Sequence, residues 1–297
     1  MTRRRFPVGK TLLYVFMSLW ALTTIYPFIW VILNSFKPRG LIRSDTFSLP
    51  IGDKFTLENY VTAFKRVDIG TAYVNSIVIS GAVTVVVMVL AGLAAYAMVR
   101  YSFRLRGFLH SMIIASMMFP VFSTIIPVFR MESSWGIVNT GSIWLTRLSV
   151  VLPQIAGNLS FAIIVLMGFI RSLPVDLEEA AYLEGYNVYQ IFFRIIMPLA
   201  KPTIMVILLY YAVGHWNAWF HAMIYLRDAD KMPLQIFLRD ILTRSQLGAM
   251  TGQTDVEDVG QTIKYATIIV STVPILCVYP FIQKHFVKGV MIGAVKE

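Results

Sequence analysis

Six long stretches of apolar residues alternate with short polar segments along this chain. Each stretch is long enough to cross about 30 Å of hydrocarbon as a helix, which takes about 20 residues. A single open strand would leave its backbone polar groups unsatisfied in lipid, so each stretch is interpreted as a helix. The pattern predicts an all-α integral membrane protein with six transmembrane helices over about 11–36, 71–99, 107–129, 148–170, 203–226 and 265–286.

Prolines interrupt several of these stretches. Pro27, Pro120, Pro127 and Pro274 predict kinks or short unwound turns, because proline lacks the backbone N–H that continues a helix. Composition strengthens the membrane interpretation: 57% of residues are hydrophobic and 14% are charged, against about 25% charged in a soluble domain. The one cysteine, Cys277, excludes an internal disulfide and a cysteine-based metal cluster.

The positive charge favours one orientation. The net charge is +10, and an even number of spans places both termini on the same side. Arg100, Arg104 and Arg106 crowd a very short loop that contains no acid, and residues 3–5 are all arginine, which is typical of cytoplasmic flanks. The basic residues within 37–43, after the first span, argue weakly for the opposite orientation. We expect both termini in the cytoplasm, and the charge forms no clustered basic domain for nucleic acid.

The predicted spans lack the groups of several familiar mechanisms. They contain no Asp or Glu, although ion-coupled transporters usually need an intramembrane carboxylate. We therefore expect the driving energy to come from outside the membrane. The zinc-protease and nucleophile-elbow motifs are absent, and so is the phosphate-binding G-x-x-x-x-G-K-[ST] loop. His215 and His221 are six residues apart and lie far apart around a helix. We expect no catalytic residue, no bound metal and no cofactor in this chain.

The segment 171–202 predicts a helix–turn–helix between the fourth and fifth spans. Asp176 followed by Glu179 is typical of a capping box that begins a helix. Gly185 is placed to end that helix in a left-handed conformation. Asn187 followed by Gln190 predicts a second capping box, and the second helix should run to about Met197, where the next residue, a proline, interrupts it.

The first of these short helices has a low apolar face. Leu177, Ala180 and Ala181 fall at i, i+3 and i+4, so we expect them on one side, with acidic residues around them. Such a helix suits docking into a groove on a soluble partner. The alternative is an amphipathic helix lying on lipid, which predicts basic flanks and large apolar side chains. The sequence offers neither feature, which favours docking.

This segment resembles the EAA loop of binding-protein-dependent ABC importer permeases. The pattern runs from Glu179-Ala-Ala through Gly185 and Ile195 to Met197-Pro198, with methionine where leucine is usual. The C-terminal segment 287–297 is similar to the tail of the maltose-type (MalG-like) carbohydrate permeases, and 214–220 to the W-N region of their fifth core helix. The stretch 279–284 resembles a subgroup associated with oligosaccharides of plant and algal polysaccharides such as alginate.

The resemblance implies one transmembrane permease domain over 1–297 and a set of partners. These are a second homologous permease, two ATPase subunits that bind ATP and Mg, and a periplasmic or lipid-anchored solute-binding protein. The chain itself would be no enzyme, and it would lie in a bacterial inner membrane and move a sugar or oligosaccharide by alternating access. The resemblance assigns ATPase coupling to Glu178, Glu179, Ala180, Ala181, Gly185, Ile195 and Pro198, and a tail contact with the ATPases to Lys288, Gly289 and Gly293.

The fifth span carries aromatic rings beside amide and imidazole groups, which suits sugar recognition. The substrate-pathway candidates are Tyr210, His215, Trp216, Asn217, Trp219 and His221. For most of them, packing and an interfacial aromatic belt are the simpler explanation; the exceptions are His215 and Asn217, because polar side chains in a span usually face the bundle or a cavity. The loops 37–70 and 227–261 are candidates for the binding-protein platform. Two rivals remain: a permease for glycerol phosphate, amino acids or peptides, and a membrane scaffold or receptor.

Overall fold

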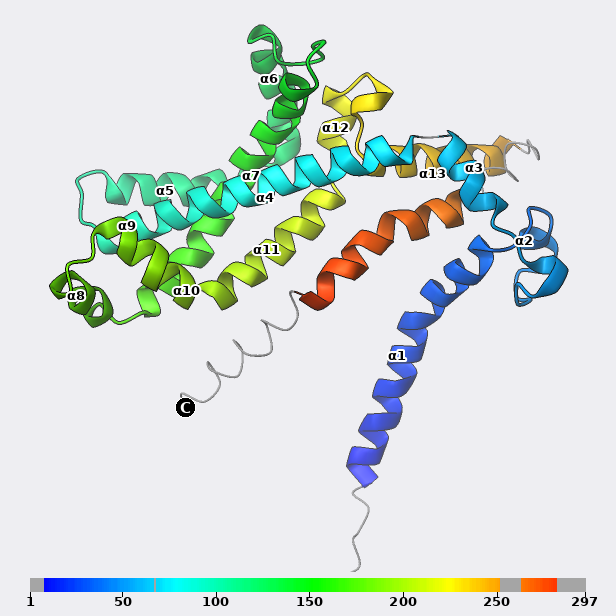
Figure 1. The fold of residues 1–297 in the computed structure, drawn as a ribbon, viewed down its shortest axis with the longest axis horizontal. Helices are drawn as coiled ribbons and strands as arrows, with labels where there is room; N and C mark the ends of the chain where they lie inside the picture. Colours follow the sequence, from blue (N-terminus) through cyan, green and yellow to red (C-terminus); the bar gives the residue numbers. More distant parts are fainter. Residues whose placement is uncertain (1–7, 67, 252–262, 282–297) are drawn as a thin grey trace, which may run out of the picture. The chain divides into compact units, whose positions relative to one another are not determined.

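A computed structural model describes residues 8–66, 68–251 and 263–281, and in these ranges every regular element is a helix (Figure 1). The chain divides into two units. One comprises residues 1–68 and 238–273, and the other comprises residues 69–237 and 274–297. Each unit is described by itself.

Four helices within the described ranges are long and apolar enough to cross a membrane singly. They are α1 (Val8–Ser35), α4 (Ile69–Arg100), α7 (Ile143–Ser172) and the helix Ile263–Phe281. Two bent helix pairs raise the number to as many as six if each pair forms one span. The described residues therefore fit a multi-pass membrane protein, although two of the stretches predicted as single spans are broken.

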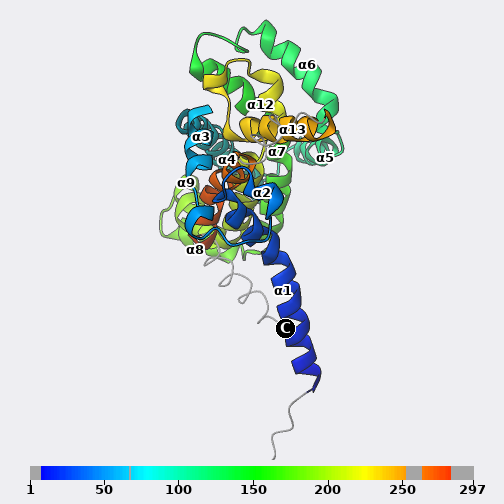
Figure 2. The ribbon, with the colours of Figure 1, turned by 90° about the vertical axis from the view of Figure 1, so that its right-hand side faces the viewer.

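The third apolar stretch is not one helix. It forms α5 (Arg106–Ser116) and α6 (Val121–Ser134), whose axes meet at 105°; Figure 2 shows the two as separate helices. Pro120 has an extended backbone (φ −63°, ψ 128°) and precedes the first residue of α6, so the proline expected to kink the stretch breaks it completely. α6 also continues beyond the predicted end at residue 129 and includes Glu132, a buried carboxylate just outside the predicted span.

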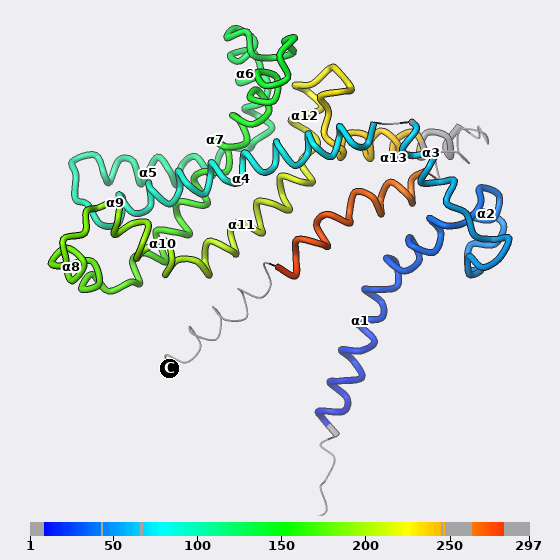
Figure 3. Tube along the Cα trace, in the orientation of Figure 1, coloured from blue at the N-terminus to red at the C-terminus, as the bar shows by residue number. Residues whose placement is uncertain are grey.

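The fifth apolar stretch is broken too. α11 (Lys201–Trp216) ends before residues 217–219, and α12 (Phe220–Tyr225) follows. Before α11, the chain passes through α9 (Val188–Ile191), the π-helical turn η2 (Phe192–Ile196) and α10 (Met197–Leu199), as the tube in Figure 3 traces. The segment Val188–Leu199, predicted as a short loop helix, meets α11 at 75°.

The segment after α1 is folded. It contains α2 (Leu41–Ser44), η1 (Gly52–Lys54) and α3 (Glu58–Arg66). The Asn59 amide donates hydrogen bonds of 2.8 Å to the carbonyl oxygens of Ser35 and Lys37, and thereby fixes α3 to the end of α1. The Lys54 ammonium, 2.8 Å from Asp45, holds the pKa of that half-buried carboxyl below its usual value. The expectation of partial structure in this loop is confirmed.

The core of the second unit lies where α4 packs along α7 and α11. Val83, Val87, Ala91 and Ala95 of α4 are four residues apart and fully buried, so one face of α4 is apolar with two alanines toward its C-terminal half. Small side chains let neighbouring helix backbones approach closely, which is how helices pack inside lipid.

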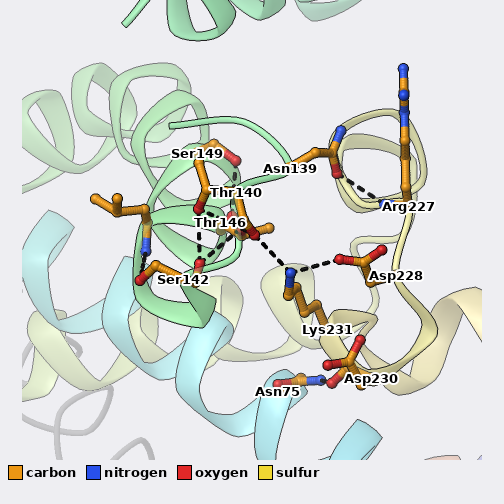
Figure 4. A network of polar contacts seen from close by, with 11 residues as sticks. Asn75, Asn139, Thr140, Ser142, Thr146, Ser149, Arg227, Asp228, Asp230 and Lys231 are labelled. Carbon is orange, nitrogen blue, oxygen red and sulfur yellow. Dashed lines mark hydrogen bonds and ion pairs between the residues drawn. The ribbon is translucent and has the colours of Figure 1, made fainter. Parts of the chain in front are cut away.

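A polar network closes this unit at the N-terminal ends of α4 and α7 (Figure 4). The Asn75 amide donates to the carbonyl oxygens of Asp230 (2.8 Å) and Met232 (3.1 Å) and accepts from Arg147 Nη2 at 2.7 Å. Asp230 belongs to η3 (Ala229–Lys231), which leads to α13 (Leu234–Thr251). The network therefore fixes the segment after α12 to two long helices.

Candidate functional site

The first short helix of segment 171–202 is α8 (Asp176–Leu183), and it begins one residue earlier than predicted. Val175 already has helical angles, and its carbonyl accepts from the backbone N–H groups of Glu178 and Glu179. The predicted capping box of Asp176 with Glu179 is wrong, because no side chain caps this end. Asp176 instead lies in the first turn, where its charge favours the helix N-terminus.

Gly185 ends α8 as predicted. Its φ of +86° is left-handed, a conformation that costs other residues strain. The Gly185 N–H donates to Tyr182 O, and the Tyr186 N–H donates to Ala181 O, both at 3.0 Å. These two bonds form a Schellman motif, which satisfies carbonyl groups at the helix end.

The second predicted capping box is confirmed. The Asn187 side chain accepts from the Gln190 N–H at 2.9 Å, and the Gln190 side chain accepts from the Asn187 N–H at 2.8 Å. α9 then widens into η2, which contains Ile195, and Pro198 lies in the first turn of α10. A π-helical turn is rare and is frequently found at functional sites.

α8 presents a different face from the one that spacing suggested. Ala181 is buried, whereas Leu177 and Ala180 are exposed, so the three do not form one outward face. Glu179 is exposed, and Leu183 is 91% exposed at the end of the helix. An exposed leucine beside an exposed carboxylate is a surface that suits a partner.

Glu178 points into the protein. Its carboxylate accepts from Arg100 Nε at 2.5 Å and from the Tyr96 hydroxyl at 2.8 Å. Arg100 also donates to the Leu173 carbonyl oxygen at 3.0 Å. Tyr101 lies edge-on to Tyr96, and burial raises the pKa of its phenol, which stays neutral. These contacts fix α8 beside the C-terminal end of α4, as Figure 1 shows.

An open pocket of about 610 Å³ lies between α7 and α11. Its lining contains three of the predicted pathway residues, Tyr210, His215 and His221. His215 Nδ1 lies 3.1 Å from Gln154 Oε1, while Gln154 Nε2 donates to Val150 O at 3.0 Å. The amide oxygen therefore accepts a hydrogen bond from Nδ1–H, which leaves Nε2 of a neutral imidazole as an acceptor. No partner for Nε2 is found in the described ranges.

Sequence reasoning missed two polar residues of this pocket. Gln154 and Asn158 of α7 line it, and the Asn158 amide donates to Gln154 O at 2.7 Å. The Tyr211 hydroxyl donates to Asn158 O at 2.5 Å. A signal was available, because two amides four residues apart in an apolar span lie on one helix face and usually point away from lipid. All lining residues of this pocket are uncharged or histidine.

The other pathway candidates lie elsewhere. Trp216 is buried and lines a second, apolar pocket of about 460 Å³. Asn217 lines neither pocket; it is exposed at the end of α11, donates to Val213 O and accepts from Gln235. Trp219 lies edge-on to Phe220 between α11 and α12. Asn217 thus contacts α13 and not the pocket, and its place in a substrate pathway stays a prediction.

Two further expectations concern other regions. The tail candidates Lys288, Gly289 and Gly293 lie outside the described residues. In the described part of the chain, no three side chains of the types that ligate metals come together.

Long apolar helices that border an open pocket, with a short helix at one end, fit a membrane transport component. The chain matches the sequence profile of the family described as "Binding-protein-dependent transport system inner membrane component" over residues 87–292. It belongs to that family, as the sequence resemblance predicted.

The chain is similar to named relatives over almost its whole length. The chain is 37% identical to the polygalacturonan/rhamnogalacturonan transport system permease protein YtcP of Bacillus subtilis (strain 168), with 96% of this chain and 97% of the relative covered. It is 31% identical to the diacetylchitobiose uptake system permease protein NgcG of Streptomyces coelicolor, with 94% and 87% covered. A solved bacterial ABC transporter involved in the import of the acidic polysaccharide alginate matches with a TM-score of 0.77, 26% identity and coverage of 96% and 99%. The fold is that of a type I ABC importer permease.

Proposed function

We propose that this chain is the permease subunit of an ATP-driven importer that moves a sugar or oligosaccharide across the inner membrane by alternating access. The observation that carries the proposal is the near full-length match to permeases whose names specify oligosaccharide or polysaccharide substrates. ATP binding must favour the outward-facing state by several kcal/mol to reverse a strongly biased equilibrium. ATP hydrolysis and Mg binding belong to partner ATPase subunits.

α8 is the proposed contact with those ATPases. Glu179, Ala180 and Leu183 are exposed, and the left-handed Gly185 ends the helix so that this surface projects from the bundle. Ile195 and Pro198 support it through η2 and α10. With α8 on the cytoplasmic side, both termini are cytoplasmic, and the segments after α1 and α12 meet the solute-binding protein on the other side.

A second permease completes the proposed pathway. In the unit formed by residues 1–68 and 238–273, the apolar window of α1 has no buried residue. The pocket between α7 and α11 is likewise open on one side. A homologous permease would cover α1 and close the pocket, and lipid would cover what remains.

The pocket chemistry supports a saccharide substrate. Aromatic rings such as Tyr210 pack against the C–H faces of sugars, and hydroxyl groups pair with amides and with the His215 acceptor. The similarity to the alginate importer and to YtcP supports oligosaccharides of plant or algal polysaccharides within this class.

Uptake into proteoliposomes tests the proposal. The chain is purified with its second permease and ATPases, and ATP hydrolysis and accumulation of labelled oligosaccharides are measured with loaded binding protein. We expect stimulated hydrolysis and accumulation, both suppressed when His215→Leu removes the ring nitrogens. Glycerol phosphate, amino acids and peptides are the competing cargos. If loaded binding protein does not stimulate ATP hydrolysis by the complex, the chain is a scaffold and the proposal is overturned.

A further inference from the structure

One face of α4 packs against segment 171–202. Gly92, Tyr96 and Arg100 are four residues apart, so they form a single stripe along the C-terminal half of the helix. A Cβ atom at Gly92 would lie 3.4 Å from the ring of Phe192, at van der Waals contact, so η2 packs directly against this part of α4. The Tyr96 ring packs on the same Phe192 with centroids 5.4 Å apart.

The stripe ends in a buried ion pair. The Arg100 and Glu178 side chains are 11% and 6% exposed, and their atoms Nε and Oε1 are 2.5 Å apart. The second carboxylate oxygen accepts from the Tyr96 hydroxyl, so both oxygens of Glu178 are occupied by α4. Arg100 spans α8 and the chain that enters it, because it also bonds to Leu173 O.

A buried pair of this kind constrains geometry more than it adds stability. Removing charges from water costs most of what their attraction returns, but separating them leaves an uncompensated charge. α8 therefore cannot slide or rotate against α4 without a large penalty. The adjacent acid, Glu179, has no such restraint and is exposed. Glu178 is therefore held inside the protein, whereas Glu179 is available to a partner.

α4 is suited to carry a displacement. It is an unbroken helix of 32 residues without proline, whereas the stretches that form α5–α6 and α9–α11 are bent. Asn75 and Arg100 are 25 positions apart in the sequence, which corresponds to about 38 Å of helix at 1.5 Å per residue. At the Asn75 end the helix holds the segment that contains η3. One rigid element thus joins α8 to the opposite end of the unit.

We propose that Glu178, Arg100 and Tyr96 form a rigid link that transfers a displacement of α8 to α4, and that Glu178 is a positioning residue and not an ATPase contact. The inference rests on the proposed function, in which an ATPase moves α8. It separates Glu178 from the coupling surface to which sequence resemblance assigned it.

The test compares ATP consumption with transport in proteoliposomes that contain the whole complex. Glu178→Gln and Tyr96→Phe should retain the ATPase subunits and their hydrolysis, while substrate moved per ATP falls about tenfold for the first and less for the second. Glu179→Gln should instead weaken retention of the ATPases. Arg104→Gln, an exposed arginine in the adjoining loop, is the matched control and should behave as wild type.

The exchanged pair Arg100→Glu with Glu178→Arg gives a further measurement. Partial recovery of transport per ATP, relative to either single exchange, supports the link. If the exchanged pair fails to assemble, the ratio for Tyr96→Phe decides, because that change removes one hydroxyl. Normal coupling in Glu178→Gln, or loss of ATPase subunits as in Glu179→Gln, would overturn the inference. Absence of uptake by the wild type would instead refute the proposed function.

Discussion

Asn75 shows how much one buried side chain can hold together. Its amide satisfies two backbone carbonyls of the segment after α12 and the guanidinium of Arg147, and none of its atoms is exposed. Arg147 is itself buried and lies 5.0 Å from the centre of the Trp144 ring. The attachment of α4 to the segment with η3, of which Figure 4 draws the contact of Asn75 with Asp230, thus depends on a residue that hydropathy alone would treat as an interruption of a span.

Replacing Asn75 by alanine should destabilise the second unit. Each buried partner left without a hydrogen bond costs about 1–3 kcal/mol, and a charged partner costs more, so we expect a loss of at least about 2 kcal/mol. The thermal midpoint of the purified complex measures this. Ile77→Ala, two residues away and exposed, is the control and should leave the midpoint almost unchanged. Equal midpoints for the two variants would contradict the role assigned to the network.

Gly185 allows a second test at the residue scale. A side chain at φ +86° costs about 1–2 kcal/mol, so Gly185→Ala should loosen the end of α8. Asparagine tolerates the left-handed region better, and Gly185→Asn should be milder. Hydrogen exchange of the Tyr186 amide, which closes the Schellman motif, reports the effect. Gly107→Ala is the control: it lies in α5, a new Cβ there would have no atom within 4 Å, and exchange of the Tyr186 amide should not change. Exchange of that amide as slow in Gly185→Ala as in the wild type would refute the argument.

At the scale of elements, the beginnings of the two short helices give opposite outcomes for one sequence signal. Both contain an acceptor followed three residues later by Glu or Gln. The signal holds at Asn187, whose φ and ψ (−82°, 167°) are extended, as a capping residue requires. It fails at Asp176, because the preceding residue is already helical and moves the helix start. Local spacing cannot report the backbone angles that decide between the two.

This contrast supplies its own experiment. Asn187→Ala should destabilise the start of α9 by about 1 kcal/mol, and the double change with Gln190→Ala should cost less than the two single costs added. Asp176→Ala should change stability by less than about 0.5 kcal/mol. The measurement is the free energy of local opening from hydrogen exchange in α9 and α8. A larger effect at Asp176 than at Asn187 would contradict the structure.

The limits of sequence reasoning follow from the range of the interactions involved. Apolar run length placed α1, α4 and α7 within a few residues, because the transfer of apolar surface to lipid is a local property. Pro120 marked the break at residues 117–120 as a kink or short unwound turn, but not its 105° bend. The break at 217–219 was missed, since a break depends on what satisfies the freed backbone groups. Sequence spacing also placed Glu178 at the outward surface of α8, because its partner Arg100 is 78 residues earlier and could not be foreseen.

At the scale of the whole molecule, α1 is the helix whose apolar window is not covered by other described parts of the chain. Leu12, Phe16, Leu19 and Trp20 are all more than half exposed. Lipid or a second permease must cover them, and the two covers differ physically. Lipid adapts to any apolar side chain, whereas a packed helix does not.

A tryptophan scan of α1 distinguishes these covers. Each residue from Leu12 to Ile29 except Trp20 is replaced in turn by tryptophan, and retention of the second permease is measured after affinity purification through this chain. If the second permease covers α1, retention should fall at positions that recur every 3.6 residues, because only one helix face meets the partner. Positions on the opposite face of α1 are the control, and tryptophan there should leave retention of the second permease unchanged. Uniform retention at every position would mean that lipid alone surrounds α1, and the second permease would then have to dock through the open pocket between α7 and α11.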